Sequence, residues 1–209
     1  MTTAELEVRE LALRGPRGWV YQGVSFEASA GVVALAGPRG SGRTSLLLTL
    51  AGRMRPGGGE AVVFGHPLPR RAARVRGLSA LGPVPGVNDL EQSLSVGEHL
   101  RERRWLHRGT RRPAEVLAEV GLAELQPRTL VRDLDELDAF RLGTALALLG
   151  RPRLLAVDDV PDRPEAWQLL HAVAEREDGP LVLAATLDVP GLPAETVVPL
   201  AHDKESARA

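Results

Sequence analysis

The chain has 209 residues, 44% of them hydrophobic and 25% charged, a composition typical of one soluble domain, alone or with a subdomain. It has no cysteine, which excludes disulfides, iron–sulfur clusters and thiol chemistry, and its 26 basic and 27 acidic residues give no indication of a nucleic-acid partner. No apolar run reaches the ~18 residues of a membrane span, and the first residues lack the pattern of a signal peptide, so we expect a cytoplasmic protein.

The first part of the chain predicts short strands followed by a helix. Alternating apolar residues predict a strand over residues 4–13, and the segment 19–28 predicts one or two more. The apolar run 32–36 predicts a buried strand. The run 46–51 predicts a helix that ends near Arg53, because the Pro-Gly-rich segment after it cannot continue a helix.

The turn between that buried strand and that helix matches the phosphate-binding loop pattern G-x-x-x-x-G-K-[ST] at every fixed position but one, where Arg43 replaces the lysine. Its glycines allow consecutive backbone N–H groups to point inward, and the start of the helix favours an anion such as a triphosphate. The hydroxyl of Thr44 is placed to ligate Mg²⁺. The predicted nucleotide-binding residues are Gly37, Pro38, Arg39, Gly40, Ser41, Gly42, Arg43, Thr44 and Ser45.

An ordinary glycine-rich turn is the alternative interpretation of this segment. The strand before it and the helix after it favour the phosphate-binding loop. Arg43 changes the chemistry, because lysine delivers a compact charge between phosphates whereas a guanidinium is wider and planar.

The segment after the first helix predicts two further strands, at residues 61–64 and 78–81. The residues 68–80 are rich in arginine. We interpret this short basic run as a solvated face rather than a binding surface. A loop rich in proline and glycine follows at residues 83–93.

The middle of the chain predicts helices. Ser95, with Glu98 three residues later, forms the pattern of a capping box at the start of a helix that extends to about Trp105. Further helices are predicted over residues 113–120 and 135–149. We expect these helices to form a subdomain, about residues 88–150, within a single domain that spans residues 1–209.

The last third predicts buried parallel strands. Residues 154–157 and 181–186 are continuously apolar and are separated by an amphipathic helix over 164–177, a pattern typical of a parallel sheet covered on both faces. The first of these strands ends in Asp158 and Asp159. Alone, this pair favours a solvated turn. Together with the loop at 37–45, it predicts that Asp158 holds Mg²⁺ and that Asp159 polarises an attacking water as the general base.

These parts, in this order, resemble the ATP-binding cassette of ABC transporters over about residues 4–200. The run Ala145–Asp159 is similar to the family's ARALLxxPxLLLLDE segment, and Leu94–Leu100 is similar to its LTVxENL segment. The resemblance implies an α/β P-loop NTPase fold: a mostly parallel sheet flanked by helices, an N-terminal antiparallel β part and an inserted helical subdomain.

The resemblance also implies a function. It implies an ATP-binding subunit that uses ATP and Mg²⁺ and couples to a membrane permease subunit. It implies pairing with another cassette, as a homodimer or heterodimer, and a peripheral position on the inner face of the cell membrane through the permease. No nucleic-acid partner is implied.

The chain departs from the family pattern at several positions. The family's LSGGQ segment, which grips the γ-phosphate held by the opposite subunit, aligns with Leu134–Asp138, where three residues are acidic. The Q-loop glutamine aligns with Gly86, although Gln92 is nearby, and the switch histidine aligns with Leu187. The catalytic glutamate aligns with Asp159. We therefore expect weak hydrolysis.

Two aromatic residues are candidates to stack on adenine, Trp19 and Tyr21, and a packing role is equally open for both. Three hypotheses follow for the whole chain. It is an ATP-binding transporter subunit, a degenerate cassette that acts as a non-hydrolysing interaction or regulatory subunit, or an unrelated P-loop NTPase. The order of the motifs favours the first two.

Overall fold

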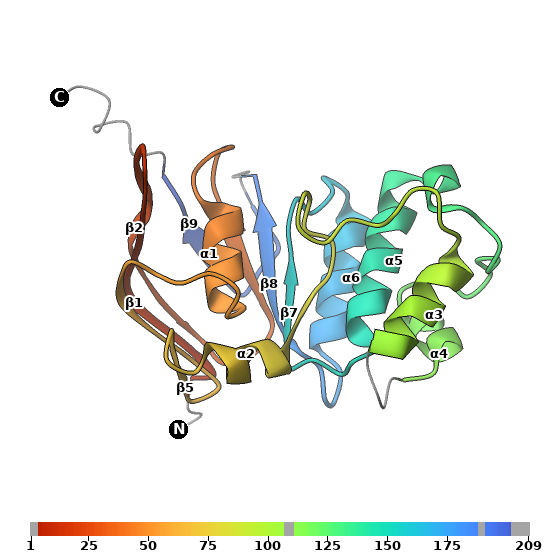
Figure 1. Cartoon of the computed structure of the whole chain (residues 1–209), viewed down its shortest axis with the longest axis horizontal. Helices are drawn as coiled ribbons and strands as arrows, with labels where there is room; N and C mark the ends of the chain where they lie inside the picture. The colour runs from red at the N-terminus through yellow and green to blue at the C-terminus, as the bar shows by residue number, and fades with distance from the viewer. Residues whose placement is uncertain (1–3, 107–110, 188–190, 202–209) are drawn as a thin grey trace.

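The computed structural model describes residues 4–106, 111–187 and 191–201. An antiparallel sheet and a parallel sheet lie on either side of helix α1 (Arg43–Leu50), and the other long helices cover the far face of the parallel sheet (Figure 1). This is the mixed α/β arrangement that the sequence predicted, with the antiparallel part formed mainly by the N-terminal strands.

The antiparallel sheet has the strand order β2-β1-β4-β5 and is built from β1 (Leu6–Gly15), β2 (Gly18–Ala28), β4 (Gly58–Val63) and β5 (His66–Leu68). The parallel sheet has the order β6-β7-β8-β3-β9 and is built from β6 (Ser79–Leu81), β7 (Leu154–Val157), β8 (Leu181–Thr186), β3 (Val32–Ala36) and β9 (Thr196–Pro199). Every strand pair in this second sheet is parallel.

The central parallel strands have side chains in two separate hydrophobic cores. In β3, Val33 and Leu35 pack toward α1 and the antiparallel sheet, while Val32 and Ala34 pack toward the helices on the other face. β7 and β8 alternate in the same way. Because both faces are covered, apolar residues are favoured at every position, which is why these strands are continuously hydrophobic.

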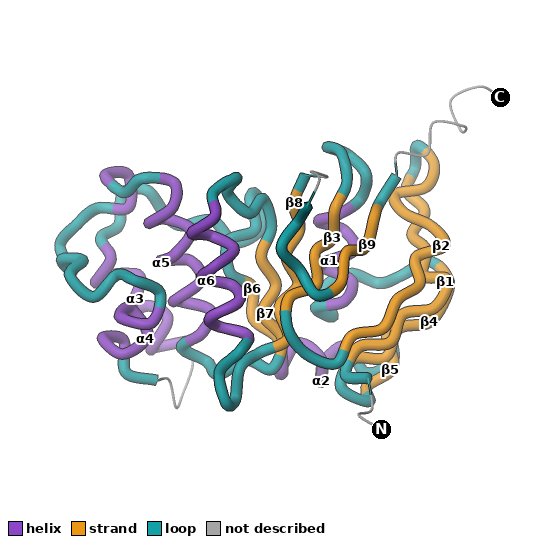
Figure 2. Tube along the Cα trace, turned by 180° about the vertical axis from the view of Figure 1, so that it is seen from behind, coloured by secondary structure: helices purple, strands orange, loops and turns teal. Residues whose placement is uncertain are grey.

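The remaining helices are α2 (Ala72–Leu78), α3 (Val96–Leu106), α4 (Pro113–Glu119), the short 3₁₀ helix η1 (Val131–Asp133), α5 (Glu136–Leu148) and α6 (Pro164–Ala174). Helix α5 contacts α3 and α4 as well as α6 and β7. Figure 2 shows α3, α4 and α5 together at the end of the molecule away from the antiparallel sheet.

Four elements were not expected from the sequence: β5, α2, η1 and β9. In β9 only Val198 is buried, so this edge strand has no run of apolar residues to reveal it. Helix α2 lies within the basic run and buries only Val75, which is too little for a helical hydrophobic pattern. The segment 19–28, predicted as one or two strands, forms the single strand β2.

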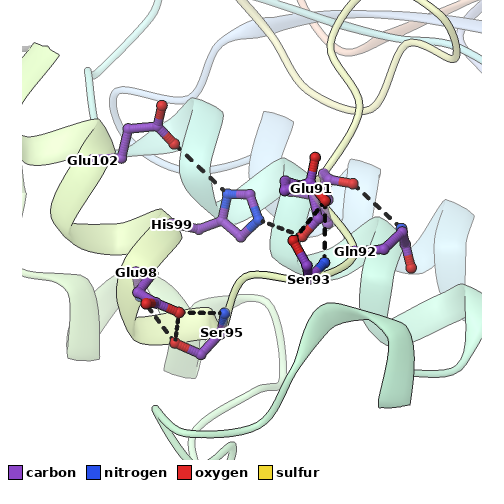
Figure 3. Close-up of polar contacts among 8 residues, drawn as sticks. Glu91, Gln92, Ser93, Ser95, Glu98, His99 and Glu102 are labelled. Carbon is purple, nitrogen blue, oxygen red and sulfur yellow. Dashed lines mark hydrogen bonds and ion pairs between the residues drawn. The ribbon is translucent and has the colours of Figure 1, made fainter.

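The predicted capping box is formed at the start of α3 (Figure 3). Ser95 donates from its hydroxyl and its backbone N–H to Oε2 of Glu98, at 2.6 and 2.8 Å, and the N–H of Glu98 donates to the Ser95 hydroxyl at 3.4 Å. These bonds lower the pKa of Glu98, because they stabilise its carboxylate.

We predict that Ser95→Ala lowers the free energy of unfolding by about 1 kcal/mol, the usual cost of losing an N-cap side chain. Ser93→Ala is the matched control, because Ser93 also donates to a glutamate carboxylate, at 2.8 Å on Glu91, but caps no helix. Urea unfolding of the two variants measures the difference. Equal effects would contradict a capping role.

The capping box should also depend on pH. Because folding lowers the pKa of Glu98, its stabilising effect is complete above the ordinary glutamate value of 4.5 and is lost as the pH falls through the lowered pKa. The stability difference between the wild-type chain and Ser95→Ala should therefore shrink in this acidic range.

Candidate nucleotide-binding site

The glycine-rich turn joins the end of β3 to the start of α1, as predicted. Gly42 occupies the N-cap of α1 with φ 87°, in the left-handed region. A Cβ atom at Gly42 would lie 2.1 Å from the carbonyl oxygen of Val20, and one at Gly37 would lie 2.4 Å from the carbonyl oxygen of Leu200. Glycine is therefore the only residue that fits these two positions without moving the backbone of β2 or the segment after β9.

The turn holds two buried polar groups without hydrogen-bond partners. Ser41 is 1% exposed and Arg43 is 7% exposed. The Ser41 hydroxyl and Nη1 of Arg43 are two of only four such side-chain atoms in the described residues. Because a buried donor without a partner destabilises a protein, their presence in one turn fits an anion that accepts from both.

Thr44 and Asp158 come together from separate elements, α1 and the end of β7. The Thr44 hydroxyl donates to Oδ2 of Asp158 at 2.5 Å, and Asp158 is only 4% exposed. The backbone N–H of Asp158 donates to the carbonyl oxygen of Pro83 at 2.8 Å, which fixes the strand end. A hydroxyl and a carboxylate are ligands suited to Mg²⁺.

These two residues cannot enclose a cation alone. The described residues contain no group of three or more His, Cys, Asp or Glu side chains able to hold a metal ion. Thr44 and Asp158 therefore fit Mg²⁺ that takes its other ligands from water and from a bound phosphate, the usual arrangement for this cation.

Arg43 also faces the predicted general base. Its Nη2 lies 3.6 Å from Oδ1 of Asp159, whose side chain is half exposed. Asp159 has φ 46°, and its backbone N–H donates to Oδ1 of Asp158 at 2.8 Å. One end of the guanidinium thus contacts a carboxylate while Nη1 stays unpaired. A lysine side chain has a single nitrogen, so it could not contact Asp159 with one nitrogen and keep another unpaired.

The two candidate aromatic residues have different surroundings. Tyr21 is buried, its hydroxyl is 2.8 Å from Oγ1 of Thr49, and burial raises its pKa, so its role is in packing against α1. Trp19 is 41% exposed, with the Arg14 guanidinium 5.6 Å from its ring centre. Both line a cavity of about 420 Å³ that also touches Gly40 of the turn.

The segment Leu134–Asp138, aligned with LSGGQ, starts α5. Asp135 is the N-cap residue, and its side chain accepts from the backbone N–H of Asp138 at 2.8 Å. Asp138 pairs with Arg141 at 3.0 Å. The carboxylate of Asp135 thus already occupies an anion-binding position at this helix start.

Two other positions that the sequence aligned with family motifs are Gly86 and Leu187. The backbone N–H of Gly86 donates to the Asp89 side chain at 2.8 Å, and Leu187 is 45% exposed. Gln92, to which the sequence gave no role, lines the same cavity of about 430 Å³ as Asp158 and Asp159. Only the tertiary structure brings this amide to the strand end.

Comparison with known proteins identifies similar sequences. A protein-family model described as "ABC transporter" matches residues 21–161. The Nod factor export ATP-binding protein I of Rhizobium meliloti (strain 1021) is 33% identical over 180 residues, covering 80% of this chain and 52% of that protein. The cytochrome c biogenesis ATP-binding export protein CcmA of Pseudomonas fluorescens (strain Pf0-1) is 31% identical over 194 residues, covering 89% and 90%.

The chain therefore spans about half the length of the Nod factor export proteins, but nearly all of the CcmA protein. Among solved structures, cbiO1 from Clostridium perfringens, part of the ABC transporter complex cbiONQ, has a TM-score of 0.77 at 20% identity, covering 94% of this chain and 84% of that one. This likeness establishes a shared fold. No helix among the described residues is long and apolar enough to span a membrane.

We predict that Gly42→Ala destabilises the chain more than Gly86→Ala. Both glycines have positive φ, 87° and 74°, which costs alanine about 1 kcal/mol at each site. A Cβ at Gly86 meets no atom within 4 Å, whereas one at Gly42 collides with the Val20 carbonyl. We expect a further loss of about 1–3 kcal/mol for Gly42→Ala. Urea unfolding checks this, and equal losses would contradict the close contact.

Proposed function

The chain belongs to the ABC transporter family, and we propose that it is an ATP-binding subunit that holds MgATP in the loop at residues 37–45 and couples to a membrane permease. The observation that carries this proposal is the pair of unpartnered buried donors, the Ser41 hydroxyl and Nη1 of Arg43. Nucleotide phosphates supply the acceptors that these donors lack.

The chain's own residues divide the work of binding. Arg43 keeps a buried Nη1 without a protein partner while its Nη2 lies 3.6 Å from Asp159, so Nη1 is the nitrogen left to donate to a phosphate. Thr44 and Asp158 would hold Mg²⁺, which when bound withdraws charge from the phosphate oxygens. Trp19 is the candidate to contact the base, because Tyr21 is committed to Thr49.

Asp159 remains the proposed general base, but its contact with Arg43 limits its ability to orient water. Its carboxylate is in contact with Arg43, so the charge that would orient an attacking water is shared with the cation that binds phosphate. Gly86 and Leu187, where the family has a glutamine and a histidine, offer no side chain to bond the γ-phosphate. These features support slow hydrolysis.

Pairing with a second cassette completes the proposal. In this family, the LSGGQ segment of one subunit binds nucleotide held by the other, so a partner cassette would close on the loop at residues 37–45. The corresponding segment of this chain would present Asp135, Glu136 and Asp138 to the partner's nucleotide. Like charges repel there by about 1–4 kcal/mol per contact at ~4 Å, which disfavours a symmetric homodimer with two closed sites.

The Asp135 cap favours a second candidate function, a non-hydrolysing interaction or regulatory subunit. The helix start that would bind the opposite phosphate is occupied by this chain's own carboxylate at 2.8 Å. In that case the cassette keeps the fold and works through contacts with its partners rather than through turnover.

We predict that Arg43→Ala lowers the affinity for MgATP by about 10- to 100-fold, because a charge-assisted hydrogen bond contributes about 1.5–3 kcal/mol. Arg128→Ala is the matched control, since Arg128 is an exposed arginine outside the loop at residues 37–45 and outside the cavities beside it. Thr44→Ala should weaken MgATP binding but not ATP binding in EDTA. Calorimetry measures all of these affinities, and an Arg43→Ala variant with unchanged affinity contradicts the proposed site.

We predict that Asp159→Asn raises MgATP affinity by about three- to tenfold, because it removes a negative charge from the anion site and releases Arg43. Asp162→Asn, the same change at an exposed residue three positions later, should have little effect. Phosphate release in the complex with its partners should fall with Asp159→Asn alone. Release at background level that Asp159→Asn leaves unchanged would favour the non-hydrolysing candidate.

A further inference from the structure

A second polar cavity lies at the opposite end of α1 from the glycine-rich turn. It measures about 450 Å³ and is formed by the segment after α1 and by the start of α2, which pack together at the lower edge of Figure 1. Four arginines line it, Arg53, Arg55, Arg70 and Arg76, and we call it the arginine cavity. The sequence predicted a solvated face for the basic run, but folding adds Arg53 and Arg55 from another segment.

The positive charge of this cavity is not balanced. None of its lining residues is acidic, and none of the four arginines forms an ion pair with a residue that the structure describes. Burial lowers the pKa of the Arg53 guanidinium, and the nearby charges of Arg76 and Arg103 lower it further. The whole chain carries a net charge of −1, so this surplus is a local feature.

Two of the four arginines have a structural role that fixes their position. Arg53 donates to the carbonyl oxygens of Ala51 and Ser79, at 2.7 and 3.2 Å, and Arg76 donates to that of Gly52 at 2.9 Å. The bonds to Ala51 and Gly52 satisfy carbonyl groups directly after the C-terminal end of α1, where positive charge is favourable, and the bond to Ser79 joins Arg53 to the start of β6. They also hold both guanidinium groups in fixed places.

Arg55 and Arg70 have no such structural role. Both are exposed, and neither makes a side-chain hydrogen bond or an ion pair within the described parts of the chain. Their guanidinium groups satisfy no protein acceptor in the described residues, and the charge of Arg76 already acts against that of Arg53. An anion of more than one negative charge would relieve this repulsion.

We propose that the arginine cavity binds the phosphate groups of a multivalent phosphate anion. Planar guanidinium groups match phosphate oxygens in a two-pronged geometry, and two of the four are already held in position. The phosphate belongs either to a soluble polyphosphate compound or to the headgroup of an anionic lipid. The site is separate from the nucleotide loop, because the two lie at opposite ends of α1 (Figure 1).

The test uses the full chain carrying Arg43→Ala, so that the nucleotide loop contributes little to binding. Its affinity for sodium tripolyphosphate is measured by calorimetry, and its affinity for phosphatidylglycerol vesicles, against pure phosphatidylcholine vesicles, is measured by co-sedimentation. Adding Arg55→Gln and Arg70→Gln should lower the affinity at least about tenfold in one of the two arms. The arm that responds identifies the source of the phosphate.

The matched control adds Arg17→Gln and Arg128→Gln instead, which removes the same charge from exposed residues outside the cavity. This control should change the affinity less than about threefold, as expected for distant screened charges. An equal loss in both variants, or no binding in either arm, overturns the proposal. Neither result depends on nucleotide binding at the loop, so the proposed function is tested separately.

Discussion

The burial of Arg43 is the constraint on which the rest of the site depends. Arg43 is 7% exposed and its guanidinium needs partners, and among the described residues only one carboxylate pairs with it, Asp159 at 3.6 Å. Its other terminal nitrogen is buried and unpaired. A buried cation with one weak ion pair is costly unless a second acceptor is present, and in the proposed function a nucleotide phosphate is that acceptor.

The fold supplies the geometry that makes this burial possible. The parallel strands β3 and β7 end at the same edge of the sheet, so the turn after one meets the carboxylates after the other. Because apolar side chains cover both faces of the parallel sheet, its polar groups gather at the ends of the strands. Two cationic regions lie at opposite ends of α1: Arg43 at its start and the arginine cavity beyond its end.

The residues that the sequence aligned with the family's motifs interact with neighbouring residues of the same chain. Arg43 stands where the family pattern has lysine, and Asp159 stands where it has glutamate. The cation is therefore broader and the carboxylate shorter than in that pattern, and the two groups lie 3.6 Å apart. At the start of α5, where the sequence aligns with LSGGQ, Asp135 accepts a hydrogen bond from the backbone N–H of Asp138. This cap stabilises the helix.

The sequence by itself determined the elements whose patterns are local. The glycine-rich turn, the capping box at Ser95 and the continuous apolar strands are each specified by neighbouring residues, and the α/β class followed from their order. The sequence could not reveal β9 or α2, because each buries a single side chain. Only the tertiary structure decided which distant groups come together: Arg43 pairs with Asp159, Gln92 lines one cavity with the carboxylates after β7, and Arg53 lines another with Arg70. Such contacts depend on how strands and helices pack, and packing joins residues that no sequence window contains.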